Sequence, residues 1–181
     1  IMKILITGGM GFVGSHLTEE LLKNKHEIIV VTKSQKKRNN LKKIVKQVIL
    51  EQIDITNFGK IEKCLKKHKP DVIIHLAGEN IADGRWTKKR KNSIKSSRVL
   101  STRNLVSTLA SMQNPPKIFI SSSAVGFYGK NKPVELYEDL DSGKDFLSNV
   151  CKEWEQEAFR AKKHNIRTVA LRIGIVLGYE G

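Results

Sequence analysis

The sequence predicts an α/β fold in which a doubly wound parallel sheet carries helices on both faces. Three observations predict it. Short apolar runs alternate with segments whose apolar residues recur at helical spacing, the runs are continuous instead of half-polar, and a glycine-rich turn joins the first run to the first helical segment. Continuous apolar strands are typical of a parallel sheet covered on both faces. Right-handed crossovers between such strands distribute the helices over the two sides.

The first half of the chain alternates strands and helices. The expected strands are the apolar runs at residues 2–7, 27–32, 47–52 and 72–77. Between them, helices are expected at residues 11–24, 40–46 and 57–68. Leu17, Leu21 and Leu22 give the first helix an apolar stripe. Asn57 stands where it can cap the last of these helices.

The second half repeats this alternation after an irregular stretch at residues 78–86. A long helical pattern runs from about residue 88 to residue 112 and ends before Pro115, because proline cannot continue a helix. The remaining expected elements are a strand, a loop, a helix and a strand, at residues 117–123, 124–143, 146–164 and 166–174. Residues 175–181 add no closing element.

The bulk composition fits one globular domain over residues 1–181. The chain is 39% hydrophobic and 28% charged, and no apolar run approaches the roughly 20 residues that span a bilayer. The first apolar run is too short for a secretory signal. Cys64 and Cys151 lie far apart, without the spacing of paired metal ligands, which fits a reducing compartment. We expect a cytoplasmic protein with no metal site.

The net charge of +15 raises the question of an anionic partner. The lysines are spread along the chain and are interpreted as solvated helix faces. Aromatic residues do not interleave with the basic runs, so nucleic-acid binding is only a minor alternative.

The turn after the first strand contains Gly9-x-Gly11-x-x-Gly14, preceded by Gly8. It follows a strand and opens an amphipathic helix, the context that a Rossmann-type dinucleotide site requires. The early glycines allow a tight turn, Gly11 lets the backbone approach a pyrophosphate, and Gly14 lets the helix pack on the sheet. The amides at the helix N-terminus then face the phosphates.

The residues after the second strand indicate which dinucleotide binds. A carboxylate there would hold the ribose 2′-hydroxyl of NAD, but this chain has hydroxyl and cationic side chains instead. They are Thr32, Lys33, Ser34, Lys36, Lys37 and Arg38. We therefore predict NADP as the cofactor, with NAD as the second choice. Asp54 and Ile55 would lie near the adenine, although Asp54 could equally cap the next helix.

The motifs resemble an identifiable family. The stretches "TGGMGFVG", "HLAG", "SSSAV" and "LRIGIVLG" are similar to those of the extended short-chain dehydrogenase/reductases. The stretches "LAGENIADGRWT" and "SSSAVGFYG" resemble an atypical branch of NAD(P)-dependent epimerases and dehydratases known as nucleoside-diphosphate-sugar epimerases. The resemblance covers the whole chain. In that family a smaller C-terminal substrate-binding region follows "LRIGIVLG", and this chain lacks it.

The resemblance implies a set of cofactor contacts. The phosphate turn corresponds to Thr7, Gly8, Gly9, Met10, Gly11, Phe12, Val13 and Gly14. The stretch under the adenosine ribose corresponds to Leu76, Ala77 and Gly78. The nicotinamide end corresponds to Ser121, Ser122, Arg172, Ile173 and Gly174.

The superfamily's catalytic Tyr-x-x-x-Lys pair is missing. Aligning the helix after strand five on Glu155 puts Leu147 at the tyrosine position and Cys151 at the lysine position. In the superfamily the tyrosine is the acid/base, and the lysine lowers its pKa. A leucine cannot transfer a proton, and a neutral thiol has no fixed charge. Arg98 falls where the superfamily has a supporting asparagine.

Five residues are candidates for the missing chemistry: Ser123, Tyr128, Arg98, Glu79 and Cys151. Ser123 matches the superfamily's catalytic serine, and Arg98 would stabilise charge. Packing is the favoured interpretation of Tyr128 and Cys151, and Glu79 could instead bind loop backbone. His75 is interpreted as a hydrogen-bonded core histidine, and Trp86 as a loop anchor.

Two functions remain open. The first is an NADP-dependent epimerase or oxidoreductase acting on a small polar molecule, such as a nucleotide sugar. The second is a non-catalytic NADP-binding protein with a structural or redox-sensing role. The resemblance also suggests a homodimer formed through the two long helices, and we expect no membrane partner.

Overall fold

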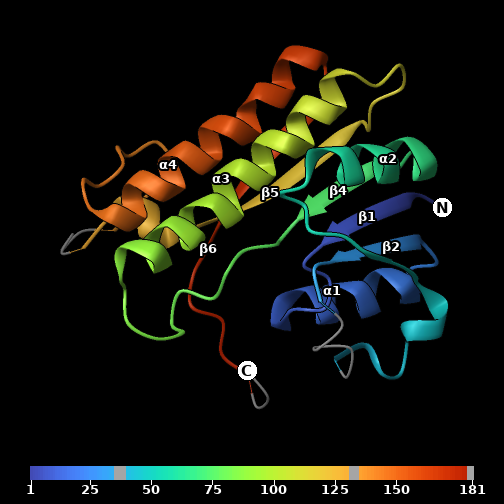
Figure 1. Cartoon of the computed structure of the whole chain (residues 1–181), viewed down its shortest axis with the longest axis horizontal. Helices are drawn as coiled ribbons and strands as arrows, with labels where there is room; N and C mark the ends of the chain where they lie inside the picture. The colour runs from blue at the N-terminus through green and yellow to red at the C-terminus, as the bar shows by residue number, and fades with distance from the viewer. Residues whose placement is uncertain (35–39, 131–134, 179–181) are drawn as a thin grey trace.

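A computed structural model of the chain describes residues 1–34, 40–130 and 135–178. Within these residues it has a six-stranded parallel sheet in the order β3-β2-β1-β4-β5-β6. The strands are β1 (Lys3–Thr7), β2 (Glu27–Thr32), β3 (Ile49–Gln52), β4 (Val72–His75), β5 (Ile118–Ala124) and β6 (Arg167–Ile173). The order reverses between β1 and β4, which are neighbours at the centre of the sheet (Figure 1). This confirms the predicted doubly wound fold.

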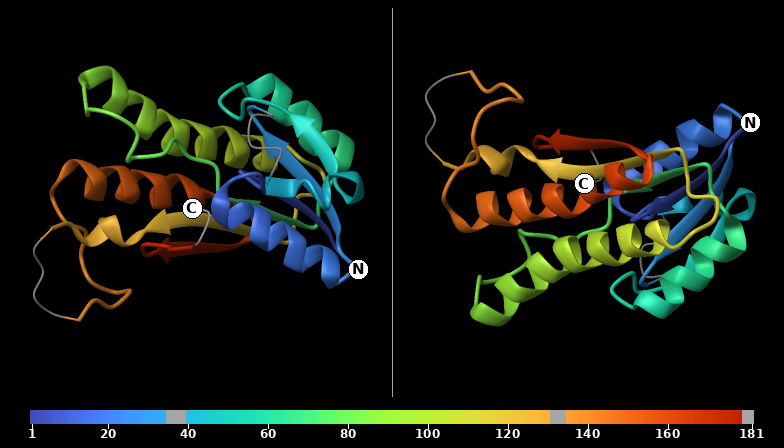
Figure 2. Two further views of the ribbon diagram at one scale, coloured as in Figure 1. Left: turned by 90° about the horizontal axis from the view of Figure 1, so that it is seen from below. Right: turned by 90° about the horizontal axis from the view of Figure 1, so that it is seen from above.

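Helices cover both faces of the sheet, as the two edge-on views show (Figure 2). One face carries α1 (Phe12–Lys23), and the other carries α2 (Phe58–His68), α3 (Lys88–Ala110) and α4 (Phe146–Phe159). The central strands contribute side chains to the core on both faces of the sheet. Leu5 of β1 packs into the cluster under α2 and α3, whereas its neighbours Ile4 and Ile6 pack under α1. This double burial explains the continuous apolar runs of the sequence.

The helix N-termini are capped by side chains where the sequence offers them. Asn57 Oδ1 accepts a hydrogen bond from Lys60 N at 3.1 Å, so the cap predicted for α2 is present. Asp54 is not a helix cap, because its Oδ1 accepts from Thr56 N at 3.0 Å and closes a turn before the helix begins. The alternative role considered for Asp54 is therefore excluded.

The short helix expected at residues 40–46 was a wrong prediction. The segment forms turns, the last of which is the 3₁₀ turn η2 (Val45–Gln47). Leu41 is fully buried, and Ile44 and Val45 pack against the same cluster under α1. The apolar residues are therefore spaced as they are because they pack against the core. The segment is also too short to offset the cost of helix nucleation.

Two further boundaries differ from the expectation. The helix expected at 146–164 ends at Phe159, and the chain continues as a 3₁₀ turn, η4 (Arg160–His164). Asn165 then adopts φ 57°, a left-handed conformation that ends the segment. The expected loop at 124–143 begins with another 3₁₀ turn, η3 (Val125–Tyr128).

Among the described residues, no helix combines the length and apolar character needed to cross a membrane.

His75 lies in the centre of the molecule, as the sequence predicted. Its Nδ1 is 2.6 Å from Thr7 Oγ1 and its Nε2 is 3.0 Å from Thr102 Oγ1, so β4 is tied to β1 and α3. Burial, and next the nearby charge of Arg98, lower the pKa of His75 to about 3. The imidazole is therefore a neutral structural group at physiological pH.

Candidate dinucleotide site

A cavity of about 510 Å³ opens at the carboxyl ends of β1, β2 and β4 and beside the residues that follow β3. In doubly wound folds this edge, where the strand order reverses, is the ligand-binding edge. Many of the residues predicted to bind a cofactor line it: Gly8, Met10, Gly11, Thr32, Lys33, Ser34, Asp54, Ile55, Leu76, Ala77 and Gly78. The fold thus brings together residues that are widely separated in the sequence.

The turn between β1 and α1 can be built only with glycine at two of its positions. Gly8 adopts φ +73°, and a Cβ on it would lie 2.9 Å from Ala77 N. A Cβ on Gly14 would lie 2.2 Å from Gly8 O, so α1 can approach the turn only because residue 14 has no side chain. The backbone hydrogen bond from Gly11 N to Gly8 O, at 2.8 Å, closes the turn.

Among the described residues, no side chain caps the N-terminus of α1. Its N-cap residue is Gly11, which has no side chain to accept from the N–H groups of the first turn, and no acidic residue lies in that turn. The first N–H groups of a helix need an external acceptor. The helix dipole adds a partial positive charge, so the turn suits a phosphate group.

The far end of the cavity holds an ion pair that the sequence did not predict. Lys33, just after β2, places its Nζ 3.1 Å from Asp54 Oδ2. The carboxylate missing from the end of β2 is thus supplied by the segment after β3. Burial raises the pKa of Asp54, but hydrogen bonds from Thr56 and Lys33 outweigh it and leave that pKa below its ordinary value. The other cations expected here, Lys36, Lys37 and Arg38, lie outside the described residues.

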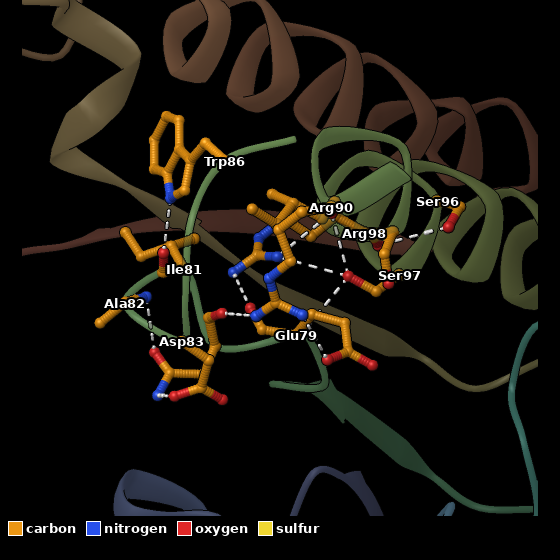
Figure 3. A network of polar contacts seen from close by, with 12 residues as sticks. Glu79, Ile81, Ala82, Asp83, Trp86, Arg90, Ser96, Ser97 and Arg98 are labelled. Carbon is orange, nitrogen blue, oxygen red and sulfur yellow. Dashed lines mark hydrogen bonds and ion pairs between the residues drawn. The ribbon is translucent and has the colours of Figure 1, made fainter. Parts of the chain in front are cut away.

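The loop after β4 is fixed to α3 by a polar network (Figure 3). Glu79 N donates to Ser97 Oγ at 3.0 Å, and Arg98 Nη2 donates to Glu79 O at 3.0 Å. Arg90 adds an ion pair to Glu79 Oε2 at 3.4 Å and a hydrogen bond to Asn80 O. The backbone of Glu79 is therefore held from α3, and Glu79 is one of the residues that line the cavity.

Trp86 anchors the end of this loop, as expected from the sequence. Its Nε1 donates to Ile81 O at 2.9 Å (Figure 3). Its ring meets Phe146 edge-on, with the ring centroids 5.8 Å apart. The loop therefore spans from the cavity to the start of α4.

A second polar network joins β5, α4 and β6. Ser123 Oγ donates to Glu155 Oε1 at 2.6 Å. Arg172 Nε and Nη2 donate to the two oxygens of Glu155 at 2.9 and 3.0 Å, and Arg172 Nη1 donates to Tyr128 OH at 2.8 Å. The hydrogen bonds to Glu155 raise the pKa of Arg172, so its charge is permanent. The guanidinium also lies 3.6 Å from the centroid of the Phe127 ring.

The position of the missing tyrosine and lysine is filled by packing groups. A Cβ on Gly126 would lie 3.7 Å from Leu147 Cβ and 4.0 Å from Cys151 Sγ, so both residues face η3. Cys151 is buried, and burial raises the pKa of its thiol above the ordinary value. Cys151 therefore remains a neutral thiol, the form that is a poor nucleophile.

The five candidate catalytic residues do not share one cavity. Glu79 borders the dinucleotide cavity, and Arg98 lies against Gly78, where an added Cβ would be 3.1 Å from its Cζ. Ser123 and Cys151 are buried. Tyr128 instead lines a second cavity of about 460 Å³, together with Arg172.

The remaining predicted cofactor residues do not border the first cavity. Thr7, Ser121 and Ser122 turn their hydroxyls inward; Ser122 Oγ, for example, donates to His75 O at 2.9 Å. Phe12 and Val13 begin α1, on the same turn as Gly9 and Gly14. Arg172 and Ile173 end β6, and Gly174 follows it.

Glu155, in the second polar network, is a residue that the sequence analysis did not single out. In the sequence analysis, Glu155 was used only to align the helix with the superfamily. In the structure, its carboxylate accepts hydrogen bonds from both Ser123 and Arg172. The signal that could have found it is its position one turn after Cys151 on a buried helix face. A carboxylate on such a face needs a partner.

The family model for the NAD dependent epimerase/dehydratase family matches residues 4–181. The chain belongs to that family. An epimerase family protein of Bacillus subtilis, YfhF, is 35% identical over 181 residues, which cover 99% of this chain and 57% of that protein. This chain spans about half the length of the curated relatives it matches.

Solved structures of the same family share the fold. The human epimerase family protein SDR39U1 (isoform 2), solved with NADPH, is 28% identical with a TM-score of 0.79, covering 99% of this chain and 56% of that one. UDP-glucuronic acid 4-epimerase from Bacillus cereus, solved with UDP-glucuronic acid and NAD, is 26% identical with a TM-score of 0.81, covering 94% of this chain and 56% of that one. The family resemblance predicted from the sequence is thus confirmed, and the family uses NAD(P).

Proposed function

We propose that this chain forms the NADP(H)-binding part of an epimerase or oxidoreductase that acts on a small polar molecule, with a nucleotide sugar as the favoured substrate class. One observation carries the proposal: the cavity at the sheet's carboxyl edge is bounded by a glycine turn whose Gly14 leaves no room for a Cβ. A turn that tight places backbone N–H groups at the cavity mouth. The diphosphate of a dinucleotide is the group that such N–H groups bind.

The choice of NADP rests on the end of the cavity beyond β2. Lys33 lines the cavity with an exposed ammonium group, whose present partner is the Asp54 carboxylate. A 2′-phosphate is a stronger partner for an ammonium than a single carboxylate, because it carries more charge and more acceptor oxygens. The NADPH found in the human relative supports this choice.

Bound NADP(H) would supply hydride transfer, and the protein would position the reactants and move protons. Glu79 is the carboxylate we assign to proton transfer, because it borders the cavity and its backbone is held by Ser97 and Arg98. Arg98 would provide the fixed positive charge that Cys151 cannot. Burial lowers the pKa of Arg98, yet a guanidinium stays charged in proteins. The roles of Ser123, Tyr128 and Cys151 stay predictions.

The second candidate function is NADP binding without catalysis. The observation that favours it is the replacement of the family's acid/base helix positions by Leu147 and by the buried thiol of Cys151. A protein that keeps the cofactor cavity, but whose reaction site is filled by packing side chains, would bind NADPH without converting any substrate. The bound cofactor would then stabilise the fold or report redox state.

We also propose that cofactor binding and substrate binding are carried out by different parts of the full protein. Residues 1–181 would bind the dinucleotide, and the additional half present in the relatives would complete the substrate site. Dimerisation through α3 and α4 remains a prediction of the resemblance.

The test is substrate turnover by the full-length protein. The protein with NADP(H) is incubated with a panel of nucleotide sugars and small carbonyl compounds, and epimerisation is followed by NMR and NADPH oxidation by absorbance. The proposal expects turnover of at least one class of substrate, and a loss of about 100-fold or more in the turnover rate of Glu79→Gln. Turnover that is absent across the panel while NADPH still binds would establish the second candidate instead.

A further inference from the structure

Three side chains with metal-binding atoms meet at the edge of the sheet, away from the dinucleotide cavity. Glu51 lies on the edge strand β3, and Cys64 and His68 lie on α2. The carboxylate oxygen, the thiol sulfur and an imidazole nitrogen all lie within 4.8 Å of one another. We propose that Glu51, Cys64 and His68 form a binding site for one divalent transition-metal ion of the zinc class. None of the three lines the cavity assigned to NADP(H).

The two elements that supply the ligands present them without rearrangement of the backbone. Cys64 and His68 are four residues apart, so they project from one face of α2 on successive turns. The same face packs on the sheet next to Glu51, whose Oε1 is 2.6 Å from His68 Nε2. Bond lengths of about 2.0–2.3 Å to a tetrahedral ion require ligand atoms about 3–4 Å apart. The three atoms lie within 4.8 Å of one another, and the Glu51–His68 hydrogen bond would open as the ion enters.

The kinds of ligand select the kind of metal. Thiolate and imidazole ligands favour Zn²⁺ and Co²⁺, whereas Mg²⁺ and Ca²⁺ prefer all-oxygen sites. A thiolate and a carboxylate together balance the two positive charges of the ion, with His68 neutral. Three protein ligands leave the fourth tetrahedral position to water.

Two of the three ligands are buried, and the third leaves the cluster accessible to an ion from solvent. Cys64 is 4% exposed and His68 8% exposed, so two ligands are already desolvated. The side chain of Glu51 is 22% exposed and keeps one side of the cluster open to solvent. Metal binding would tie the last turn of α2 to the sheet's edge strand, so the ion should stabilise the fold.

Lys67 is the competitor for this site and therefore provides its sharpest test. Its Nζ lies 2.8 Å from Glu51 Oε1, the oxygen that also contacts His68. The Lys67 side chain is 67% exposed, so its ammonium can move into water when an ion takes its place. If the cluster is only a hydrogen-bonded ion pair, removing Lys67 changes no metal affinity. If it is a metal site, removing Lys67 removes a repelling charge.

The experiment titrates chelator-treated full-length protein with Co²⁺ and then displaces the Co²⁺ with Zn²⁺. We expect visible tetrahedral cobalt bands and a near-ultraviolet thiolate-to-cobalt band, saturating at one ion per chain. Cys64→Ser should abolish the thiolate band, and His68→Gln should weaken affinity by at least about 100-fold, more than the loss of an outer partner costs. Cys151→Ser, which removes the other buried cysteine, is the matched control and should keep the band.

Lys67→Ala should raise Co²⁺ affinity severalfold. This variant changes only an exposed side chain, so it keeps the test valid even if the Cys64 variant folds poorly. Absence of the thiolate band in the wild-type protein, a band that survives Cys64→Ser, or unchanged affinity in Lys67→Ala would each overturn the proposal.

Discussion

Arg172 holds Glu155 through two parallel hydrogen bonds, from Nε to Oε1 at 2.9 Å and from Nη2 to Oε2 at 3.0 Å. The pair joins β6 to α4, and the two side chains are only 18% and 7% exposed. Ser123 donates to the same carboxylate from β5. Three elements at the carboxyl edge of the sheet are therefore fixed by one buried anion.

Removing that anion should weaken the fold. Glu155→Gln keeps the shape of the side chain but leaves the Arg172 charge buried without its partner. Breaking a buried pair in this way costs about 3 kcal/mol of the free energy of unfolding. Glu153→Gln on the same helix is the matched control, since its pair with Lys95 is exposed and contributes less than about 1 kcal/mol. Urea denaturation measures both; equal losses would show that the buried pair has no special role.

The ion pair of Lys33 and Asp54 should decide cofactor preference. Lys33→Ala removes the cation proposed to bind the 2′-phosphate, so NADPH affinity should fall by about tenfold while NADH affinity stays nearly unchanged. Asp54→Asn should have the opposite effect on NADPH, because it frees Lys33 and keeps the Oδ1 acceptor that closes the turn with Thr56. Fluorescence titration of the wild type and both variants with each cofactor measures these affinities. A parallel loss of NADH binding in Lys33→Ala would count against a 2′-phosphate contact.

His75 should make stability depend on pH in a defined window. Its pKa is lowered to about 3 in the folded protein, mainly by burial, from 6.5 in the unfolded chain. Only the unfolded chain takes up this proton between those values, so stability is complete above about pH 6.5 and falls as pH falls toward 3. Between pH 7.5 and pH 5 the loss due to His75 should be about 2 kcal/mol.

The variant His75→Asn isolates this effect. It should be less stable than the wild type at pH 7.5, because it disturbs the contacts with Thr7 and Thr102, yet it should lose less stability between pH 7.5 and pH 5. Urea unfolding at the two pH values measures the difference. An identical loss in both proteins would mean that other groups cause the acid sensitivity.

The fold could be predicted because its signals are local. Strand and helix periodicity, the Asn57 cap and the spacing of Gly8, Gly11 and Gly14 all lie within short windows, and the crossover rule arranges the strands. The helix expected near Leu41 failed because burial against α1, a long-range effect, produced the same apolar spacing. In such short segments, tertiary contacts determine the backbone conformation more strongly than helix propensity does.

The segments that line the cavity could be predicted from the sequence, but the contacts between their side chains could not. The glycine turn is such a segment, and its place at the cavity agrees with the prediction from its spacing. The pairs Lys33–Asp54 and Glu155–Arg172 each join two elements, and no local pattern states that they meet. The same holds for Glu51, which reaches Cys64 and His68 across the edge of the sheet. The sequence prediction of no metal site considered the two cysteines alone.

The most direct test of the proposed dinucleotide site is an NADPH titration of the full-length protein and its Gly14→Ala variant. An added Cβ at residue 14 would lie 2.2 Å from Gly8 O, so the turn must open and its N–H groups must move away from the diphosphate. Gly59→Ala is the control, because a Cβ there meets nothing closer than 3.9 Å. We predict that the wild type and Gly59→Ala bind NADPH and that Gly14→Ala binds at least about 100-fold more weakly, since several phosphate hydrogen bonds are lost. Unchanged NADPH affinity in a folded Gly14→Ala variant, or no NADPH binding by the wild type, would contradict it.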